Sequence, residues 1–216
     1  MVLEAFVEML ESGELFADLS ASASRLFVGF LLGTSLGIVV AIFTAKVEIF
    51  NDSVGQLLHF SRFIPPLALV PLAVLWLGIG EQSKVGLIMW AAFFPVWLNT
   101  IAGVRNIERK HLLAAKNLGA GNLRMLKEVV LPSSAPFIVS GSRIGLGFGF
   151  SVLIAAEMAG AFSGLGFRIA LLHDVFRIDK MIADIIVLGL LGLAADRLLV
   201  FSSKKLLPWL EKEDAK

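Results

Sequence analysis

The feature that most constrains this chain is a series of long stretches without a charged side chain. Residues 26–45 and 85–104 each run for twenty residues without Asp, Glu, Lys or Arg, and residues 64–80 run for seventeen. Residues 134–161 and 181–203 are apolar apart from a few charged positions. A helix of about twenty apolar residues crosses the hydrocarbon core of a bilayer. The sequence therefore predicts an all-α integral membrane protein with about five transmembrane helices.

The composition favours the same class. Hydrophobic residues make up 57% of the 216-residue chain and charged residues only 17%, against about a quarter in an average soluble domain. The absence of cysteine excludes disulfides, thiolate nucleophiles and cysteine metal sites. No basic segment precedes an apolar stretch at the start, so we expect no cleavable signal peptide. We expect residues 1–216 to form a single transmembrane domain.

Residues 1–24 differ from the apolar stretches. They carry five acidic side chains and no lysine or arginine, and their apolar residues recur at helical spacing. Such a pattern is typical of an amphipathic helix that lies along a membrane surface. We expect residues 1–24 to form a separate segment of this kind.

The positive charges predict the orientation in the membrane. If five spans are counted, thirteen of the nineteen basic residues fall on the side that holds the loop of residues 105–132. Basic residues are concentrated on the cytoplasmic side of membrane proteins. We expect the loop and the C-terminus in the cytoplasm and the acidic N-terminus outside.

The loop of residues 105–132, which we call the central loop, has a recognisable pattern. Ala114 and Ala115 are followed by Gly119, and Leu131-Pro132 close the loop. Gly119 is expected to end one short helix, because glycine readily adopts the conformation found after a helix C-terminus. Asn122 is expected to cap a second helix, including Ala120 in the turn, that ends before Pro132.

This pattern resembles the cytoplasmic loop of the membrane subunits of ABC importers. In that family the loop reads Glu-Ala-Ala, three residues, Gly, nine residues, Ile, one residue, Leu-Pro. Here Leu113 replaces the glutamate and Val129 replaces the isoleucine, while the other letters match in register. The loss of the glutamate affects any acidic contact that the family makes from this position.

The resemblance extends over nearly the whole chain and narrows to the nitrate, sulfonate and taurine branch of these permeases. It implies a fold like that of type I ABC importer permeases. Members usually have one more span before this region, so we expect either a natural five-span form or an N-terminus that has been lost. The stretches that carry the resemblance are residues 24–34, 64–85, 94–106, 131–148 and 156–167.

The resemblance also implies partners and a substrate class. Cytoplasmic ABC ATPase subunits would dock on the central loop, with Ala114, Ala115, Gly119, Ala120, Asn122, Leu131 and Pro132 as the coupling residues. A second copy of the permease would complete the pathway, and an extracytoplasmic binding protein would deliver the substrate. The substrate would be a small anion such as a sulfonate, taurine, nitrate or bicarbonate, or less often a heterocyclic vitamin precursor. No contact with nucleic acid is expected.

Two apolar stretches carry glycine at intervals of four. Such a series lies along one side of a helix and lets another helix backbone approach closely. Packing within the bundle or between copies is the favoured role, ahead of a hinge. The first glycine stripe is Gly29, Gly33 and Gly37, and the second is Gly141, Gly145 and Gly149.

Three residues are candidates for the translocation pathway. Arg143 and Glu157 are ionisable residues inside an apolar stretch, fourteen residues apart and therefore on one helix face, away from the glycines. The alternative is structural: Arg143 snorkels or pairs with Asp196, and Glu157 lies near the outer boundary. Pro71 interrupts another apolar stretch, as happens in pathway-lining helices and in inert ones.

The chain contains no GxxxxGK[ST] motif, so ATP and magnesium would be bound by a partner subunit and this chain is not expected to be an enzyme. No cofactor or metal site is expected in it. The main alternative is a secondary transporter or channel subunit driven by an ion gradient, which would need ionisable relays in several spans. A membrane-embedded hydrolase would need a nucleophile paired with a base, and the sequence offers none.

Overall fold

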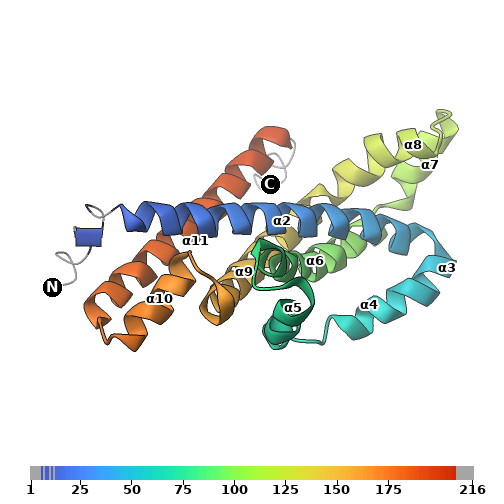
Figure 1. Ribbon diagram of the computed structural model, residues 1–216. Coiled ribbons are helices and arrows are strands. Elements are labelled where there is room, and N and C mark those ends of the chain that lie inside the picture. The colour runs from blue at the N-terminus through green and yellow to red at the C-terminus, as the bar shows by residue number, and fades with distance from the viewer. Residues whose placement is uncertain (1–5, 7, 10, 12, 208–216) are drawn as a thin grey trace.

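The computed structural model describes residues 6, 8, 9, 11 and 13–207, and this part of the chain is helical without a strand. Figure 1 shows an elongated bundle of long helices, with α7 and α8 projecting at one end, which we call the loop end. We call the opposite end the α10 end. The long helices are α2 (Glu14–Lys46), α6 (Glu81–Arg105), α9 (Leu131–Gly160) and α11 (Ile178–Leu206). The shorter elements are α3 (Glu48–Phe50), the π-helical turn η1 (Asn51–Gly55), α4 (Gln56–Ser61), the 3-10 turn η2 (Pro66–Leu69), α5 (Val70–Leu77), α7 (Arg109–Asn117), α8 (Asn122–Met125), the π-helical turn η3 (Leu126–Val130) and α10 (Leu165–Asp174).

Four stretches of the described chain are long and apolar enough to cross a bilayer by themselves. A fifth crossing exists if the bent pair Glu48–Ser61 and Pro66–Leu77 is counted as one span. The prediction of an all-α membrane protein with about five spans is therefore confirmed. The four single spans are Leu15–Lys46, Glu81–Arg105, Asn122–Gly160 and Ile178–Lys205.

The span expected over residues 64–80 does not form from these residues alone. Its only α-helix, α5, has eight residues and is about 12 Å long, too short to cross a bilayer. The helical segments on either side of residues 62–65 meet at 86°. Pro65 and Pro66 lie at this bend, and Pro71 falls in the first turn of α5, where a missing N–H breaks no hydrogen bond.

The first long helix begins earlier than the charge pattern predicts. α2 runs without a break from Glu14 to Lys46, so residues 14–24 continue the first span instead of ending a separate segment at Ser24. Most of residues 1–12 lie outside the described part of the chain. A location of the acidic segment on the outer membrane surface stays a prediction.

Helix α6 lies between α2 and α9, and both glycine stripes lie against it. Its residues Ile88, Ala92 and Val96 are four apart, and each contacts one glycine from each side. We call each such set a rung. The three rungs are Gly29–Ile88–Gly149, Gly33–Ala92–Gly145 and Gly37–Val96–Gly141. Their order makes α2 parallel and α9 antiparallel to α6.

The rungs bring the three backbones closer together than larger side chains would permit. A methyl group on Gly33 would lie 2.5 Å from the Met89 carbonyl oxygen, and one on Gly145 would lie 2.9 Å from the Ala92 carbonyl oxygen. Such distances are shorter than van der Waals contact, so neither position has room for a Cβ. Hydrocarbon provides no hydrophobic drive between helices, so close backbone packing of this kind is a main source of their association.

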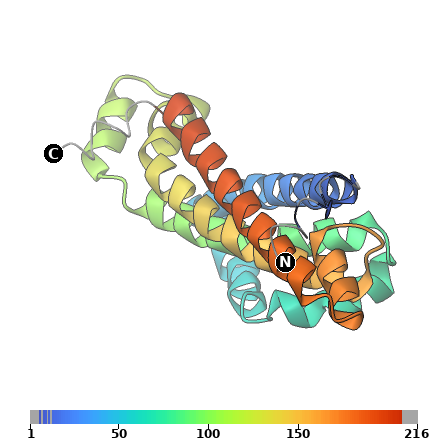
Figure 2. The same cartoon turned by 90° about the vertical axis from the view of Figure 1, so that its left-hand side faces the viewer.

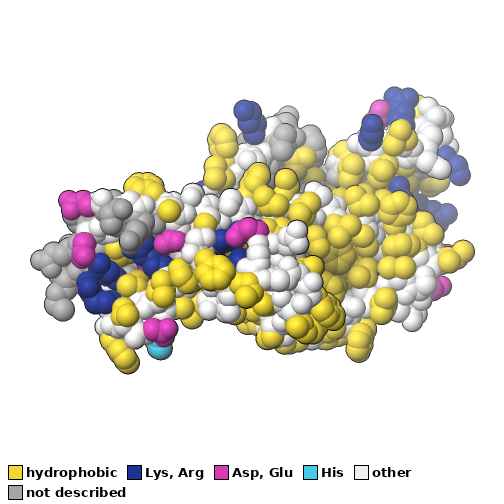
Figure 3. Space-filling model, viewed as in Figure 1, with side chains coloured by type: hydrophobic (Ala, Val, Ile, Leu, Met, Phe, Trp, Pro, Cys, Tyr) yellow, Lys and Arg dark blue, Asp and Glu magenta, His cyan; other side chains and the backbone are white. Residues whose placement is uncertain are grey.

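The outer surface of α2 is apolar. Leu32, Leu36, Val39 and Phe43 are each about half exposed, and apolar side chains cover much of the middle of the molecule in Figure 3. The basic side chains of the central loop gather at the loop end. In a membrane protein an exposed apolar surface of this type faces lipid.

The rungs predict opposite outcomes for two neighbouring glycines of α9. Gly145→Leu places a branched side chain against the backbone of α6, and overpacking of this kind costs about 1–3 kcal/mol or more. We expect a lower thermal unfolding midpoint in detergent and reduced assembly on size-exclusion chromatography. Gly147→Leu is the control, because no atom lies within 4 Å of a methyl group at Gly147. Equal losses in the two variants would contradict the rungs.

Candidate functional site

The central loop begins with α7 and a tight turn. The turn ends the helix with a pair of hydrogen bonds, from the Ala120 N–H to the Ala115 carbonyl (3.0 Å) and from the Gly119 N–H to the Lys116 carbonyl (3.0 Å). Gly119 has a positive φ of 77°, as glycine at this position of a helix C-terminus typically does. The prediction that Gly119 ends the first short helix is confirmed.

The second half of the loop differs from the expectation in two ways. Asn122 is not an N-cap: Gly121 occupies that position with extended backbone, and no side chain caps the helix. The helix also does not end before Pro132, because α8 continues through η3 into α9. Pro132 lies in the first turn of α9 at the end of the π-helical turn, a place where proline fits without breaking a helix.

The surface of the loop combines small, apolar and basic residues. Ala114 and Gly119 are exposed, Ala115 and Ala120 are half-buried, and Leu118 is 83% exposed. Around them lie exposed basic side chains, and the hydrogen bond from the Lys110 ammonium lowers the pKa of the Glu108 carboxyl. Leu113 and Leu123 are exposed as well, and several exposed apolar side chains within one polar, basic loop are a feature of surfaces that bind another protein. The exposed basic residues are Arg109, Lys110, Lys116, Arg124 and Lys127.

A second polar site lies at the α10 end, where Arg25 joins three parts of the chain. Its guanidinium donates to Glu81 of α6 through Nε (2.6 Å) and Nη2 (2.7 Å), and through Nη1 to Glu157 of α9 (2.7 Å). Nη1 and Nη2 also donate to the carbonyl and the hydroxyl of Ser163. Arg25 is 4% exposed and Glu157 has no exposed surface, so this is a buried ion pair. We call these residues the Arg25 cluster.

Helix α10 begins on this cluster and is capped by side chains from other helices. The Gly164 N–H donates to Asp18 (2.7 Å), the Leu165 N–H to the Ser22 hydroxyl (2.9 Å) and the Gly166 N–H to Glu157 (2.9 Å). The first N–H groups of a helix have no partner within the helix, and carboxylates near them are stabilised by its dipole. The cluster thus holds α2, α6, α9 and α10 together at one end.

Sequence reasoning did not find this cluster. Arg25, Glu81 and Glu157 come from three of the stretches on which the family resemblance rests, but they are far apart in the chain. The only sign of it in the sequence was that Arg25 lies next to an apolar stretch and Glu157 lies within one. An unpaired charge would be unfavourable at either position, so each needs a partner. The pairing itself depends on how the three helices pack.

Arg143 forms a different ion pair, with Asp196 of α11. The two side chains make a bidentate contact, with Nε–Oδ1 at 2.8 Å and Nη2–Oδ2 at 3.0 Å. This is the pairing that the structural alternative anticipates. The pair remains open to the surroundings: Arg143 is 52% exposed and Asp196 31%.

Arg143 and Glu157, expected on one helix face, have different surroundings in the structure. Both lie on α9, but α2 and the start of α10 cover the helix at the level of Glu157, and nothing covers Arg143 to the same extent. Burial depends on the neighbouring helices at each level, which helical periodicity alone does not reveal.

Residues 33–208 match the family described as the binding-protein-dependent transport system inner membrane component. The chain belongs to this family. The match contains the central loop, Arg143 and Glu157, and it leaves out the part of α2 that carries Arg25.

Curated relatives carry names of the same kind. The chain is 37% identical over 211 residues to a probable ABC transporter permease protein of Brucella abortus, covering 98% of this chain and 84% of that protein. It is 35% identical over 195 residues to the taurine transport system permease protein TauC of Escherichia coli, covering 90% and 71%. Further relatives are named for the transport of aliphatic sulfonates and the import of nitrate.

A solved structure shows the same fold. The permease resembles a chain of the methionine ABC transporter MetNI in an inward-facing conformation, with a TM-score of 0.66 and 17% sequence identity. The likeness covers 88% of this chain and 93% of that one. It establishes the architecture of a type I ABC importer permease, as the sequence predicts.

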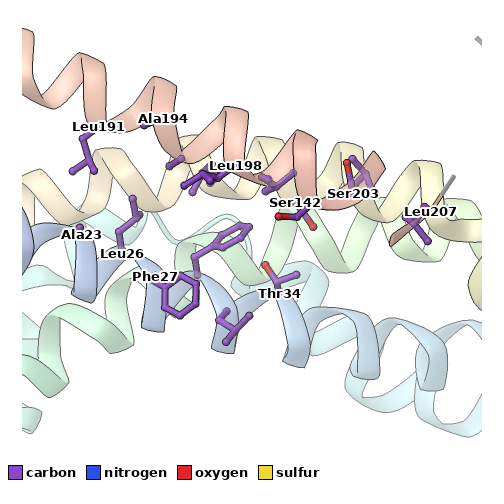
Figure 4. Close-up of a pocket in the computed structure, with 17 residues that line it drawn as sticks. Ala23, Leu26, Phe27, Thr34, Ser142, Leu191, Ala194, Leu198, Ser203 and Leu207 are labelled. Carbon is purple, nitrogen blue, oxygen red and sulfur yellow. The ribbon is translucent and has the colours of Figure 1, made fainter. Parts of the chain in front are cut away.

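The permease also has a large apolar groove that the sequence did not predict. The groove has a volume of about 630 Å³ and lies between α2, α9 and α11. Figure 4 shows Leu26, Phe27 and Leu198 pointing into it, with Thr34 and Ser142 among its few polar residues. Helix α11 runs alongside α9 (Figure 2) and packs chiefly on α9 and α10, which leaves the groove between α11 and α2.

Pro71, the third pathway candidate, lies apart from the other two. It is exposed in the first turn of α5, while Arg143 is on the exposed side of α9 and Glu157 is enclosed in the Arg25 cluster. The structure of this permease does not bring the three together. Their role in the pathway stays a prediction.

The Arg25 cluster predicts a large effect of removing its central cation. Arg25→Met leaves the carboxylate of Glu157 buried without its counter-ion, and breaking a buried ion pair in this way costs about 3–5 kcal/mol. We expect a clear drop in the thermal unfolding midpoint of the purified permease, followed by tryptophan fluorescence.

The matched control is Arg177→Met, which removes another bidentate arginine at the same end. Arg177 is 47% exposed and pairs with Asp179, so its loss should cost less than about 1 kcal/mol. The double variant Arg25→Met/Glu157→Gln should recover part of the stability, because it removes the unpaired charge. No difference between Arg25→Met and Arg177→Met would contradict a stabilising role for the cluster.

Proposed function

We propose that this permease is the membrane subunit of an ATP-driven importer for a small anion. The observation that carries the proposal is the central loop, which presents exposed Ala114, Gly119 and Leu118 within a basic surface on a chain of this transport family. The substrate class is supported by relatives named for taurine, aliphatic sulfonates and nitrate. Bicarbonate belongs to the same chemical class of small oxyanions.

Cytoplasmic ATPase subunits are proposed to dock on the central loop. The coupling residues are those of the loop pattern: Ala114, Ala115, Gly119, Ala120, Asn122, Leu131 and Pro132. ATP and magnesium are proposed to bind to those subunits and hydrolysis to occur there, in keeping with a sequence that has no GxxxxGK[ST] motif. Leu131 and Pro132 join the loop to α9, so a force on the loop acts directly on a spanning helix.

The central loop and the C-terminal end of α11 are proposed to lie in the cytoplasm, with the α10 end and the N-terminus outside. Basic residues end α2, α6 and α11 at the loop end, in keeping with the positive-inside rule. An extracytoplasmic binding protein would then deliver the substrate at the α10 end. These last basic residues are Lys46, Arg105, Lys204 and Lys205.

A second copy of the permease is proposed to complete the pathway. The exposed Arg143–Asp196 pair lies within two spanning helices, and a charged pair does not face lipid there without a large cost. A second copy can enclose this face together with water. We assign the pathway role to Arg143, and we assign Glu157 to holding the helices together in the Arg25 cluster.

Docking of the ATPase is tested by adding bulk to the loop surface. Ala114→Trp places an indole at an exposed position, where it should block a close protein contact without disturbing the membrane helices. A poor fit in such a contact costs about 1–3 kcal/mol, or roughly one to two decades of affinity. We expect normal permease abundance in the membrane, with loss of the co-expressed neighbouring ATPase on purification in mild detergent.

The control for Ala114→Trp is Lys116→Trp, which adds the same indole two residues along α7 on another side of the helix. It should retain more of the ATPase. If Ala114→Trp co-purifies with the ATPase and supports ATP-driven uptake as well as the unaltered chain does, the loop is only a connector and the proposed coupling fails.

The orientation is tested with single cysteines, because the chain has none of its own. Asp174 and Lys205 are both exposed, at the α10 end and at the loop end of α11. In intact cells, Asp174→Cys should react with a membrane-impermeant maleimide, and Lys205→Cys should react only after the membrane is opened. The reverse labelling pattern would overturn the proposed topology.

A further inference from the structure

The exposed side of α9 carries polar residues at a depth where a surface that faces lipid would be wholly apolar. Ser140, Arg143, Gly147 and Ser151 recur every three or four positions and are all exposed, with exposed Ile144 and Phe148 between them. At comparable depth, the exposed side chains of α2 include Leu32, Leu36 and Val39. A helix in contact with hydrocarbon presents apolar side chains, so this side of α9 belongs against water or protein.

The rungs give the depth of Arg143 in the membrane. Gly33 is level with Gly145 and Gly37 with Gly141, so Arg143 is level with residue 35 of α2. Residue 35 is at the midpoint of the uncharged residues 26–45. The Arg143–Asp196 pair therefore lies near the middle of the bilayer, where an exposed ion pair is most unfavourable unless it is hydrated.

The pair also has space beside it. An open cavity of about 460 Å³ adjoins it, lined by Pro136, Val139, Ser140, Arg143, Ile144 and Asp196. The cavity is large enough for a small oxyanion with several waters. The guanidinium is the only cationic group among these lining residues, and the Ser140 hydroxyl adds a further donor one turn away.

We propose that Arg143 binds the transported anion and that Asp196 is its resident counter-ion, which the anion displaces. A sulfonate, nitrate or bicarbonate group presents two oxygens to the guanidinium fork in the same way as the carboxylate that now occupies it. The guanidinium keeps an anionic partner throughout, while the displaced Asp196 carboxylate stays beside the open cavity, where water can solvate it. This assignment rests on the proposed function, because it takes the substrate to be an anion.

The counter-ion explains how one arginine can bind an anion at mid-membrane and still release it. An unpaired guanidinium there would hold an anion too tightly, and conduction requires binding that is weak enough to permit exit. Asp196 competes for Arg143 after each passage. Removal of Asp196 should therefore tighten anion binding, whereas removal of Arg143 should abolish it.

The test uses Ser140→Cys in the otherwise cysteine-free, full-length permease, reconstituted in lipid nanodiscs. Two water-soluble methanethiosulfonates are compared, one with an anionic sulfonatoethyl group and one with a cationic trimethylammonioethyl group. We expect both to react. The ratio of anionic to cationic rates should rise about three- to thirtyfold when Asp196→Asn is added, and fall by a similar factor with Arg143→Gln, as one unit charge at one helical turn predicts.

Anion binding is read out by protection of the same thiol. Methanesulfonate or nitrate should slow the modification relative to gluconate at equal ionic strength, about tenfold more effectively with Asp196→Asn than with Asp196 present. Protection should be lost with Arg143→Gln and retained in part with Arg143→Lys, which also serves if Arg143→Gln does not fold. Leu36→Cys on α2, at nearly the same depth, should react with neither reagent.

Two results would overturn the proposal. If Ser140→Cys is as unreactive as Leu36→Cys, this side of α9 faces lipid or a dry interface. If it reacts but neither the charge variants nor the anions change its rate, the ion pair only fastens α9 to α11. Either result leaves docking of the ATPase intact, so failure of the anion site is distinguishable from failure of the importer assignment.

Discussion

The close approach of α2, α6 and α9 is the constraint on which the rest of the structure depends. Three rungs hold the backbones so near to one another that a methyl group would lie less than 3.0 Å from an atom of α6 at Gly29, Gly33, Gly141 and Gly145. The rungs fix the direction of each helix and its depth relative to the others. They also determine which sides of α2 and α9 remain exposed, and hence where the lipid-facing and polar surfaces lie.

The Arg25 cluster depends on the same alignment. Removing carboxylates and guanidiniums from water is costly, and their attraction offsets that cost only when the geometry is good and the remaining donors and acceptors are paired. Here Arg25 makes five hydrogen bonds, and Glu157 accepts from Arg25, Ser22 and the start of α10. A shift of α9 by one residue relative to α2 would separate these groups. The cluster thus adds specificity of register to a bundle whose other contacts are non-directional.

Much of the architecture was predictable because it depends on local chemistry. Hydrocarbon-length apolar stretches predicted the spans, and Gly119 predicted a helix end because glycine readily adopts its backbone conformation. The features that were missed depend on distant partners. The burial of Glu157 and the groove beside Thr34 arise from which helices become neighbours. Asn122 was misassigned because Gly121 can take the extended N-cap conformation equally well, and sequence does not distinguish them.

The connection between the central loop and the proposed anion site follows from helix continuity. Asn122–Gly160 forms one helical stretch, so Arg143 lies about 31 Å along a single element from the start of α8. Near the loop end α6 is also held to α9, since a methyl group on Gly103 would lie 2.8 Å from the Phe137 Cβ. With the rungs, α2, α6 and α9 form one unit, whereas α11 packs chiefly on α9 and α10. The Arg143–Asp196 pair thus links α11 to this three-helix unit across the interface between α9 and α11. In the proposed importer, an anion on Arg143 stabilises the arrangement in which Asp196 is no longer bonded to Arg143. Because a ligand shifts a conformational equilibrium only by binding one state better than the other, this difference is what couples the anion to the motion. Movement of α11 relative to the three-helix unit is therefore the motion to which anion binding would be coupled.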